Sequence, residues 1–464
     1  MEPVMPDIAL SLTDILASLS YALDLTGGQP MGHAQRTCLI GLRLGKELGL
    51  KQNHLAPLYH ALLMKDAGCS SNAARMAEIF GSDDIASKRM SKISDWSNLL
   101  EAVQFVAVNT LPHNSLLSRV GRVIRIISNK KETTDAFMQA RCDRGAQIAL
   151  DIGLGEEAAQ CIHHLDEHWD GKGGPTHCEG DAIPILGRIA CLSQTLEVFA
   201  RTFDIKTAYN VIRKRSGKWF DPELVRIACG FQNDGRFWNS VMFKPRETLL
   251  SMEIQASSEI ATEERIDAVC DAFAGIVDSK SPFTAQHSLR VRDHTVEIAQ
   301  AFGLTGKRLT ILRRAALLHD IGKLGVSNTI LDKPGKPTDR EWQTIKLHPY
   351  YTQQILIHIT GFERITAVAA AHHERLDGNG YFQKLNAKQL DLDMRILAAA
   401  DVFDALSARR PYRDALPLNE VFAILDKDAG IALDQDCIEA LKQLNLGSNQ
   451  MFSDTLNLGL KHAA

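Results

Sequence analysis

The stretch from Ala315 to Lys323 reads AALLHDIGK. Its four apolar residues predict the end of a buried helix that leads into the adjacent pair His319-Asp320. If the helix continues, Lys323 lies on the same face as the pair, because side chains three and four residues apart are neighbours. An imidazole, a carboxylate and an ammonium group together suit a site that holds metal and phosphate. Taken alone, the pair is also compatible with a helix cap or a salt bridge.

A second copy of this pattern occurs earlier in the chain. The 33 positions that separate His287 from Asp320 also separate His33 from Asp66. Three further segments align in order: LLMKDAG on LLHDIG, LDEHWDGKGGP on HHERLDGNGYF, and GKWFDPELV on GIALDQDCI. An internal repeat of this length indicates two copies of one structural unit. We expect the first copy in residues 1–245 and the second in residues 246–464, with the boundary in the segment from Phe243 to Arg265.

Helical periodicity dominates the sequence, and runs that alternate in steps of two are scarce. An example is the three- and four-residue spacing of Ile266, Val269, Cys270, Phe273, Ile276 and Val277. The sequence therefore predicts an all-α fold of two tandem helical bundles.

Composition narrows the class of protein further. The net charge of −4 gives no footprint for DNA, and no apolar run is long enough to cross a membrane. The acidic start lacks the basic region of a signal peptide. Nine cysteines without a CxxC pair favour reduced thiols in the cytoplasm.

The second copy carries a set of side chains that bind metals in other proteins. They are His287, His319, Asp320, His348, His372, His373 and Asp401. Spacings of 24 to 32 residues between successive sites suggest that each comes from a different helix of a bundle. This number of ligands exceeds the need of one zinc ion and suits a metal pair that activates water against a phosphodiester. Asp320 is the natural bridging ligand, and Lys323 would contact phosphate.

Alternatives remain for single members of the set. His287 could be a helix histidine with ordinary partners, and His348 could be a helix-end residue before Pro349. Either Asp401 or Asp404 could be a cap or a surface charge.

Two segments border this set. The residues between Gly322 and Arg340 contain three glycines and two prolines, which predicts a loop over the site. Thr338 and Glu341 form a capping-box pattern that starts the next helix. The segment ARRPYR offers guanidinium groups that could pair with phosphate or a guanine edge, or could form a basic surface turn. These arginines are Arg409, Arg410 and Arg413.

The motifs HDIGK, HHERLDGNGY and ADVFDALSARRPYR, with His348 between them, resemble the HD-GYP subgroup of the HD-domain metal-dependent phosphohydrolases. The resemblance covers about Glu264 to Leu441. It implies an all-α core with a two- or three-metal site and hydrolysis of a cyclic dinucleotide. The substrate would be cyclic di-GMP, cleaved to pGpG or GMP, or the hybrid cyclic GMP-AMP.

The resemblance also implies roles for single residues. All seven side chains named above would be metal ligands, and Asp320 and Lys323 would take the catalytic roles. Lys323, Arg290, Arg410 and Arg413 would bind the substrate. Phe283 stands where members with a third metal carry an acidic ligand, so we expect two divalent ions. Iron or manganese is the first candidate for these ions, and zinc, nickel and magnesium are the alternatives.

This chain departs from the subgroup in two places. The GYP tripeptide reads Gly380-Tyr381-Phe382, and the first copy has lost most of the ligand set. Its replacements are Lys65, Leu165, Asp166 and Gln194. We expect a catalytically silent first copy that packs against or regulates the second, with a homodimer or a signalling protein left open as partner. The competing functions are a non-catalytic cyclic-dinucleotide receptor and a phosphohydrolase of other nucleotides.

Overall fold

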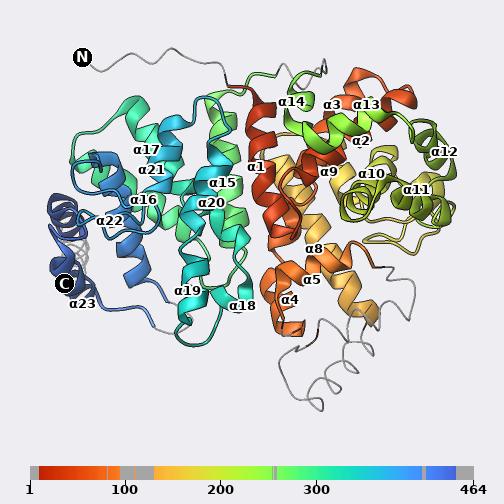
Figure 1. Ribbon diagram of the computed structural model, residues 1–464. Coiled ribbons are helices and arrows are strands. Elements are labelled where there is room, and N and C mark those ends of the chain that lie inside the picture. Colours follow the sequence, from red (N-terminus) through yellow and green to blue (C-terminus); the bar gives the residue numbers. More distant parts are fainter. Residues whose placement is uncertain are drawn as a thin grey trace, which may run out of the picture.

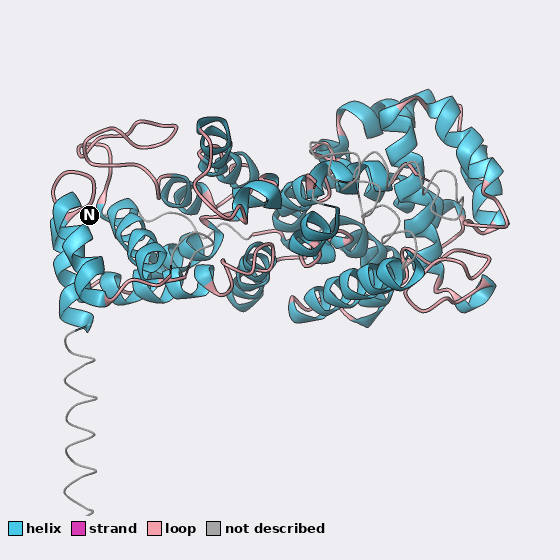
Figure 2. Ribbon diagram, turned by 90° about the horizontal axis from the view of Figure 1, so that it is seen from below, coloured by secondary structure: helices cyan, strands magenta, loops and turns pink. Residues whose placement is uncertain are grey.

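The computed structural model describes residues 10–80, 82–94, 110, 130–252, 254, 259–409 and 414–445. Helices are the only extended regular elements within these ranges, and β pairing there is limited to isolated bridges. Figure 2 shows the same result in the absence of strand arrows. The predicted all-α class is therefore confirmed.

The helices form two halves, which lie side by side in Figure 1. The first half contains α1 (Leu12–Thr26), α2 (His33–Glu47), α3 (Gln52–Met64), the 3-10 turn η1 (Ala67–Ser70), α4 (Ala73–Phe80), α5 (Asp84–Ser91), α8 (Lys130–Asp151), α9 (Glu156–His163), η2 (Gly180–Ala182), α10 (Ile185–Thr202), α11 (Ile205–Lys214), α12 (Pro222–Gly230), α13 (Gly235–Phe243) and α14 (Pro245–Leu250).

The second half contains α15 (Glu263–Asp278), α16 (His287–Ala301), α17 (Gly306–Leu318), the 3-10 turn η4 (Ile321–Gly325), α18 (Asn328–Leu331), α19 (Asp339–Ile345), α20 (His348–Leu356), α21 (Glu363–Ala370), α22 (Leu392–Ser407), α23 (Leu418–Asp428) and a last helical segment at 435–445. All six apolar residues expected on one face of α15 are buried. The boundary between residues 245 and 246 stays a prediction.

The buried helix predicted to lead into His319-Asp320 ends directly before the pair. α17 stops at Leu318, His319 is its C-cap, and Asp320 precedes the turn η4 that contains Lys323. Lys323 therefore does not lie on the helix that precedes the pair. Lys323 nevertheless contacts the carboxylate of Asp320, because three residues complete one turn of a 3-10 helix.

A glycine at the same place in each copy explains this break. A Cβ at Gly322 would lie 2.0 Å from the carbonyl oxygen of His348 on α20, and one at Gly68 would lie 2.0 Å from that of Arg141 on α8. The 3-10 turn therefore packs directly on the backbone of the next long helix. The contact sets α20 against η4, and with it the distance between His348 and Asp320.

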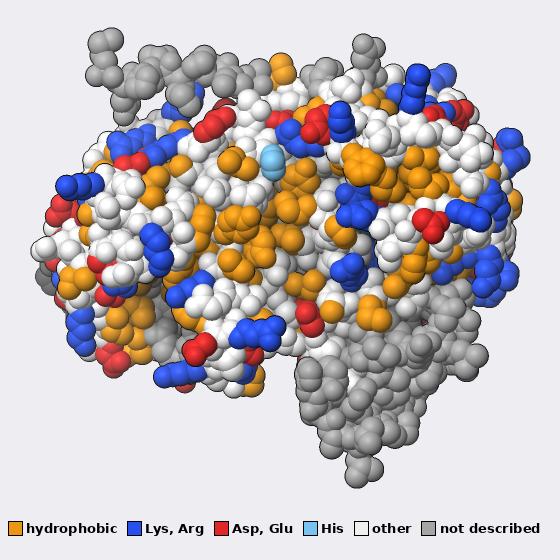
Figure 3. Space-filling view, in the orientation of Figure 1, with side chains coloured by type: hydrophobic (Ala, Val, Ile, Leu, Met, Phe, Trp, Pro, Cys, Tyr) orange, Lys and Arg blue, Asp and Glu red, His pale blue; other side chains and the backbone are white. Residues whose placement is uncertain are grey.

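The two halves meet around α1 and α15. Each of these helices contacts both η1 and η4, and α1 also packs against α20. Apolar side chains gather near the middle of the face in Figure 3, around this junction. Within the described residues, no helix has the length and hydropathy needed to span a bilayer.

Substitution of Gly322 by alanine tests the close packing of η4. The added methyl group must displace the backbone of α20, so we expect the free energy of unfolding to fall by about 3 kcal/mol. Urea denaturation followed by circular dichroism measures the change. Gly235→Ala is the control, because a Cβ added at Gly235 would have no other atom within 4 Å. Equal stability of the two variants would contradict the packing.

Candidate metal centre

Five helices of the second copy deliver the predicted ligands to one buried point. Most of the ligands lie at helix ends: His287 begins α16, His319 caps α17, His348 begins α20, and His372 and His373 follow α21. Asp401 lies within α22. Asp320 follows His319 directly. All seven side chains therefore meet, as the spacing between them suggested, although their role as ligands stays a prediction.

Asp320 lies between two groups of imidazoles. Its Oδ2 atom is 3.4 Å from Nε2 of His287 and 3.3 Å from Nε2 of His319. Its Oδ1 atom is 3.2 Å from Nε2 of His348 and 3.7 Å from Nε2 of His372. One carboxylate thus faces both groups with separate oxygens, which is the arrangement that a bridging ligand requires.

Asp401 closes the other side of the cluster. Its Oδ1 atom is 3.3 Å from Nε2 of His287 and 3.6 Å from Nε2 of His319, and its Oδ2 atom is 3.6 Å from Nδ1 of His373. Three overlapping triads place their ligand atoms within 4.8 Å of one another: His348, His372 and His373; His287, His319 and Asp401; and His319, Asp320 and His372. Each of these triads could hold a metal ion.

Backbone carbonyls fix the orientation of three of the rings. His319, His348 and His372 each donate Nδ1–H to the carbonyl three residues earlier, over 2.7, 2.7 and 2.6 Å. The lone pair of Nε2 is thereby turned toward the cluster, as metal-binding histidines need. This alignment depends on helix ends, where such carbonyls are accessible.

Two carboxylates that the sequence analysis left without a role hold His287. Asp404 accepts a hydrogen bond from its Nδ1 at 2.6 Å and also pairs with Arg290. Asp278 accepts from the N–H and the hydroxyl of Ser288, which fixes the start of α16. Asp404 follows Asp401 by three residues, and this spacing could have predicted that both lie on the same face of one helix.

The charge balance of the cluster favours a cation. Burial lowers the pKa of His319, but Asp320 and Asp401 outweigh burial and raise it to about 10. The same carboxylates, with Asp404, raise the pKa of His287 to about 9. The pull that holds a proton on these imidazoles also attracts a divalent ion.

Unsatisfied atoms identify where a metal fits. Nε2 of His287, Nε2 of His319 and Oδ1 of Asp320 are buried and make no hydrogen bond of normal geometry within the described residues. Burial lowers the pKa of His373 to about 3, and burial with neighbouring histidines holds that of His372 well below its usual value. Neutral imidazoles at His372 and His373, with ring nitrogens and a carboxylate oxygen beside them that are unpartnered among the described residues, are what a mixed nitrogen and oxygen metal site presents.

Lys323 and Tyr381 line the edge of the cluster. Lys323 donates to Asp320 and keeps part of its side chain exposed. The ring of Tyr381 lies 4.4 Å from that of His373, measured between centroids, while Phe382 packs on Tyr350. The altered GYP tripeptide therefore still places its tyrosine beside a candidate ligand.

The expected substrate-binding arginines are less informative. Arg410 and Arg413 lie outside the described residues. Arg409 is largely exposed and lies 3.6 Å from Asp414. Arg290 donates two hydrogen bonds to Asp404, at 2.5 and 3.1 Å, so its described contacts support the residue that orients His287. A role for these arginines in binding substrate stays a prediction.

The first copy fills the equivalent place with lysine ammonium groups. Lys65 Nζ donates to His33 Nε2 at 2.8 Å and to Asp66, and Lys92 Nζ donates to Asp66 at 3.0 Å and to Gln194 at 3.4 Å. All these contacts are buried or nearly so. Burial lowers the pKa of His33 to about 4, so its ring is neutral and can accept from Lys65.

The counterpart of His348 in the first copy is an arginine that sequence comparison missed. Arg141 contacts Gly68 as His348 contacts Gly322, and it pairs with Asp166, which takes the place of His373. The insertion before α8 hid this match, because it shifts the interval from Asp66. Two imidazoles of the second copy thus correspond to an ion pair in the first.

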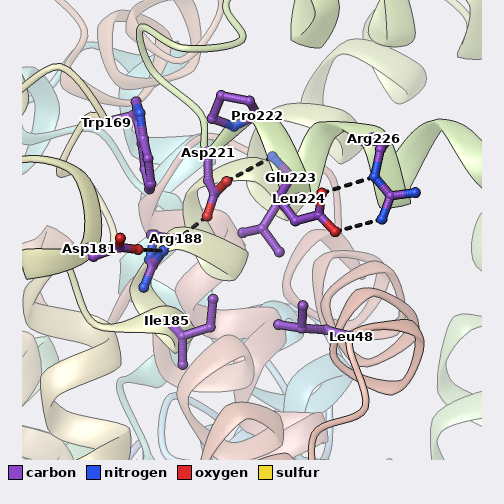
Figure 4. Close-up of a pocket in the computed structure, with 10 residues that line it drawn as sticks. All are labelled: Leu48, Trp169, Asp181, Ile185, Arg188, Asp221, Pro222, Glu223, Leu224 and Arg226. Carbon is purple, nitrogen blue, oxygen red and sulfur yellow. Dashed lines mark hydrogen bonds and ion pairs between the residues drawn. The ribbon is translucent and has the colours of Figure 1, made fainter.

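A cleft of about 660 Å³ lies elsewhere in the first half, between α2, α10 and α12 (Figure 4). Arg188 crosses it to reach Asp181 at 2.9 Å and Asp221 at 3.0 Å. The second half retains the equivalent of the latter pair in Arg395 and Asp434, at 2.9 Å. The arginine therefore reads as a fold-stabilising element common to both copies.

Asp404→Asn tests how the second copy orients His287. Loss of the charge acceptor should weaken divalent metal binding about 10- to 100-fold, because outer partners fix the ring and its basicity. Calorimetric titration of metal-stripped protein with manganese measures the affinity. Glu197→Gln, which changes the equivalent acceptor of His33, should leave it unaltered. A similar loss in both variants would contradict the assignment.

The lowered pKa of buried Glu197 predicts that the stability of the protein depends on pH. Burial raises its pKa, but His33 and Arg36 outweigh burial and lower it to about 2. A carboxyl whose pKa is depressed by folding stabilises the protein above its unfolded pKa of about 4.5, and this contribution is lost as the pH falls toward 2. At pH 6, the free energy of unfolding of wild type should exceed that of Glu197→Gln by on the order of 3 kcal/mol. The gap should narrow below pH 4.5 in urea denaturation; a constant gap would contradict the pairing.

The chain matches a family model and several known proteins. A family model described as HD domain matches the chain twice, over residues 87–224 and 271–437. The 3'3'-cGAMP-specific phosphodiesterase 3 of Vibrio cholerae is 42% identical over 441 residues, which is 94% of this chain and 95% of that protein. The cyclic di-GMP phosphodiesterase response regulator RpfG of Xanthomonas campestris is 34% identical over 200 residues, 43% of this chain and 53% of that protein.

A solved structure extends the match to three dimensions. The crystal structure of V-cGAP3, a cyclic GMP-AMP specific phosphodiesterase of V. cholerae, has a TM-score of 0.66 and 38% identity, covering 94% of this chain and 98% of that one. With two family matches, a relative of full length and the motif residues gathered at one buried point, the chain belongs to the HD-domain family, in the HD-GYP subgroup.

Proposed function

We propose that this protein is a metal-dependent phosphodiesterase that hydrolyses a 3'-5' cyclic dinucleotide. The observation that carries the proposal is the position of Asp320, whose two oxygens face two separate groups of histidines. Two divalent ions fit this arrangement, with iron or manganese as the first candidates because the donors mix nitrogen and oxygen. When bound, such ions supply Lewis acidity and an activated water for attack on phosphorus.

The protein's own side chains have separate tasks around the ions. Lys323, at the partly exposed edge of the cluster, can bind a phosphate oxygen or support the leaving oxygen. Tyr381 borders His373 and is placed to pack against a nucleotide. Burial of the ligands excludes bulk water from the reacting groups, which strengthens their electrostatic effect.

The hybrid 3'3'-cyclic GMP-AMP is the first candidate substrate. The V. cholerae relative named for this activity aligns along nearly the whole chain, whereas RpfG, named for cyclic di-GMP, covers less than half of it. Cyclic di-GMP remains the second candidate. We place the enzyme in the cytoplasm, where its nine cysteines, none of them in a disulfide, would stay reduced.

We further propose that the first copy is catalytically silent. His33 and Asp66 are the members of the ligand set that it retains, and both are occupied by Lys65. An ammonium group bonded to an imidazole and a carboxylate competes directly with a metal for the same lone pairs. Binding of an ion there would require the expulsion of a buried lysine.

Replacement of His319 and Asp320 by alanine tests both proposals in the full chain. Removal of His319, a ligand on one side of the centre, and of Asp320, the proposed bridging ligand, should lower turnover at least a thousandfold. The first copy should contribute no residual activity. The assay offers manganese- or iron-reconstituted protein 3'3'-cyclic GMP-AMP and cyclic di-GMP side by side and resolves the products. Normal turnover by the double variant would refute the site. Tight binding without turnover by wild type would favour the receptor.

A further inference from the structure

Asp84 of the first copy reaches the loop that follows the candidate centre of the second. Its side chain is fully buried, and Oδ1 accepts from the hydroxyl of Ser327 at 3.0 Å and from the N–H of Asn328 at 2.8 Å. Lys88, one turn further along α5, pairs with the other oxygen at 3.2 Å. Ser327 follows Lys323 by four residues. A carboxylate from one half therefore fastens the loop that carries the phosphate-binding lysine of the other.

Lys280 fastens the same loop from the end of α15. Its buried ammonium group donates to the carbonyl of Leu324 at 2.6 Å, and its own carbonyl accepts from the side chain of Asn328 at 2.6 Å. Burial raises the pKa of Asp84, but Lys88 and Lys280 outweigh burial and hold it below its ordinary value. The residues directly after Lys323 are thus held between the carboxylate of Asp84 and the amine of Lys280, whose pKa burial lowers to about 7.

The opposite end of α5 is anchored at the place in the first copy that corresponds to the candidate metal centre of the second. Lys92 caps the helix and donates to Asp66 at 3.0 Å and to Gln194 at 3.4 Å. Asp66 and Gln194 take the places of Asp320 and Asp401. One short helix therefore connects the equivalent centre of the first copy with the loop beside the centre of the second.

We propose that Asp84 is a positioning residue for Lys323, and that Asp66 and Gln194 at the centre of the first copy anchor α5 through Lys92. The kinetic side of this inference rests on the proposed phosphodiesterase function. A loop held at Ser327 and Asn328 keeps Lys323 at Asp320, where the substrate phosphate would bind. Release of the loop should lower kcat more than it raises KM, because precise placement matters most in the transition state.

The test compares two aspartates that each accept a backbone N–H across the junction. Asp84→Asn removes the charge beside the loop, and we expect kcat for the cyclic dinucleotide to fall about tenfold. Asp14→Asn is the control, since Asp14 on α1 accepts from the N–H of Thr360 at 3.2 Å, on a turn that carries no candidate ligand. It should leave kcat within twofold of wild type. Equal losses in the two variants would overturn the inference.

A Lys323→Ala background separates positioning from general destabilisation. If Asp84 acts through Lys323, Asp84→Asn should lower kcat little further once Lys323 is gone. A full tenfold loss in that background would show an effect by another route and overturn the inference. Lys92→Met should also lower kcat, by two- to fivefold. An unchanged kcat would show that Lys92 does not anchor α5 in a way that affects Lys323.

Hydrogen exchange provides a readout that is independent of turnover. Amides of residues 321–331 should exchange faster in Asp84→Asn than in Asp14→Asn, with unchanged exchange in α16 and α22. Ser327→Ala, which removes a single hydroxyl, gives the same comparison if Asp84→Asn folds poorly. Slow exchange in both variants would overturn the inference. Failure of wild type to hydrolyse any cyclic dinucleotide would instead refute the proposed function and leave this measurement to decide.

Discussion

Buried carboxylates at the centre of each helical copy require a positive partner, and the rest of the structure depends on how that need is met. Asp66 and Asp320 occupy the same place after the same helix, and both are almost completely buried. An isolated carboxylate in such surroundings is costly unless it is paired. In the first copy, the side-chain amines of Lys65 and Lys92 pair with Asp66. In the second, the carboxylates face imidazoles whose raised pKa values reveal a field that attracts cations.

This substitution explains how the two copies can share a scaffold while their chemistry differs. The glycine after each aspartate, the acceptor that holds the first histidine, and the glutamate after the doublet position all keep their tasks. Glu374 accepts backbone N–H groups of the following loop in the second copy, and Glu167 does the same in the first. An internal lysine satisfies the central carboxylate without a metal, so the helices still converge. The copy that lost its ligands did not have to lose its fold.

The fold class and the convergence of the seven candidate ligands could be predicted from the sequence, because both depend on residue type and spacing. The repeat made the set conspicuous, since His319, His348 and Asp401 stand where the first copy has other residues. Contacts between residues that are far apart in the sequence could not be predicted in this way. Lys92 enters the centre of the first copy from an element without a counterpart motif, and Arg141 was hidden by the insertion before α8. The end of the helix at Leu318 depends on how closely Gly322 approaches α20, which no local propensity records.

The location of the two 3-10 turns suggests why a silent copy would be retained. Both turns follow the central aspartate of their copy, and α1 and α15 each touch both. In a single bundle, the loop after Lys323 would expose Ser327 and Asn328, which here lie buried against Asp84. The second copy would then hold Lys323, the proposed phosphate contact, on a segment with fewer tertiary contacts, and such segments open most readily. A first copy whose central carboxylate pairs with its own lysines offers a packed surface on which that loop is held through Asp84.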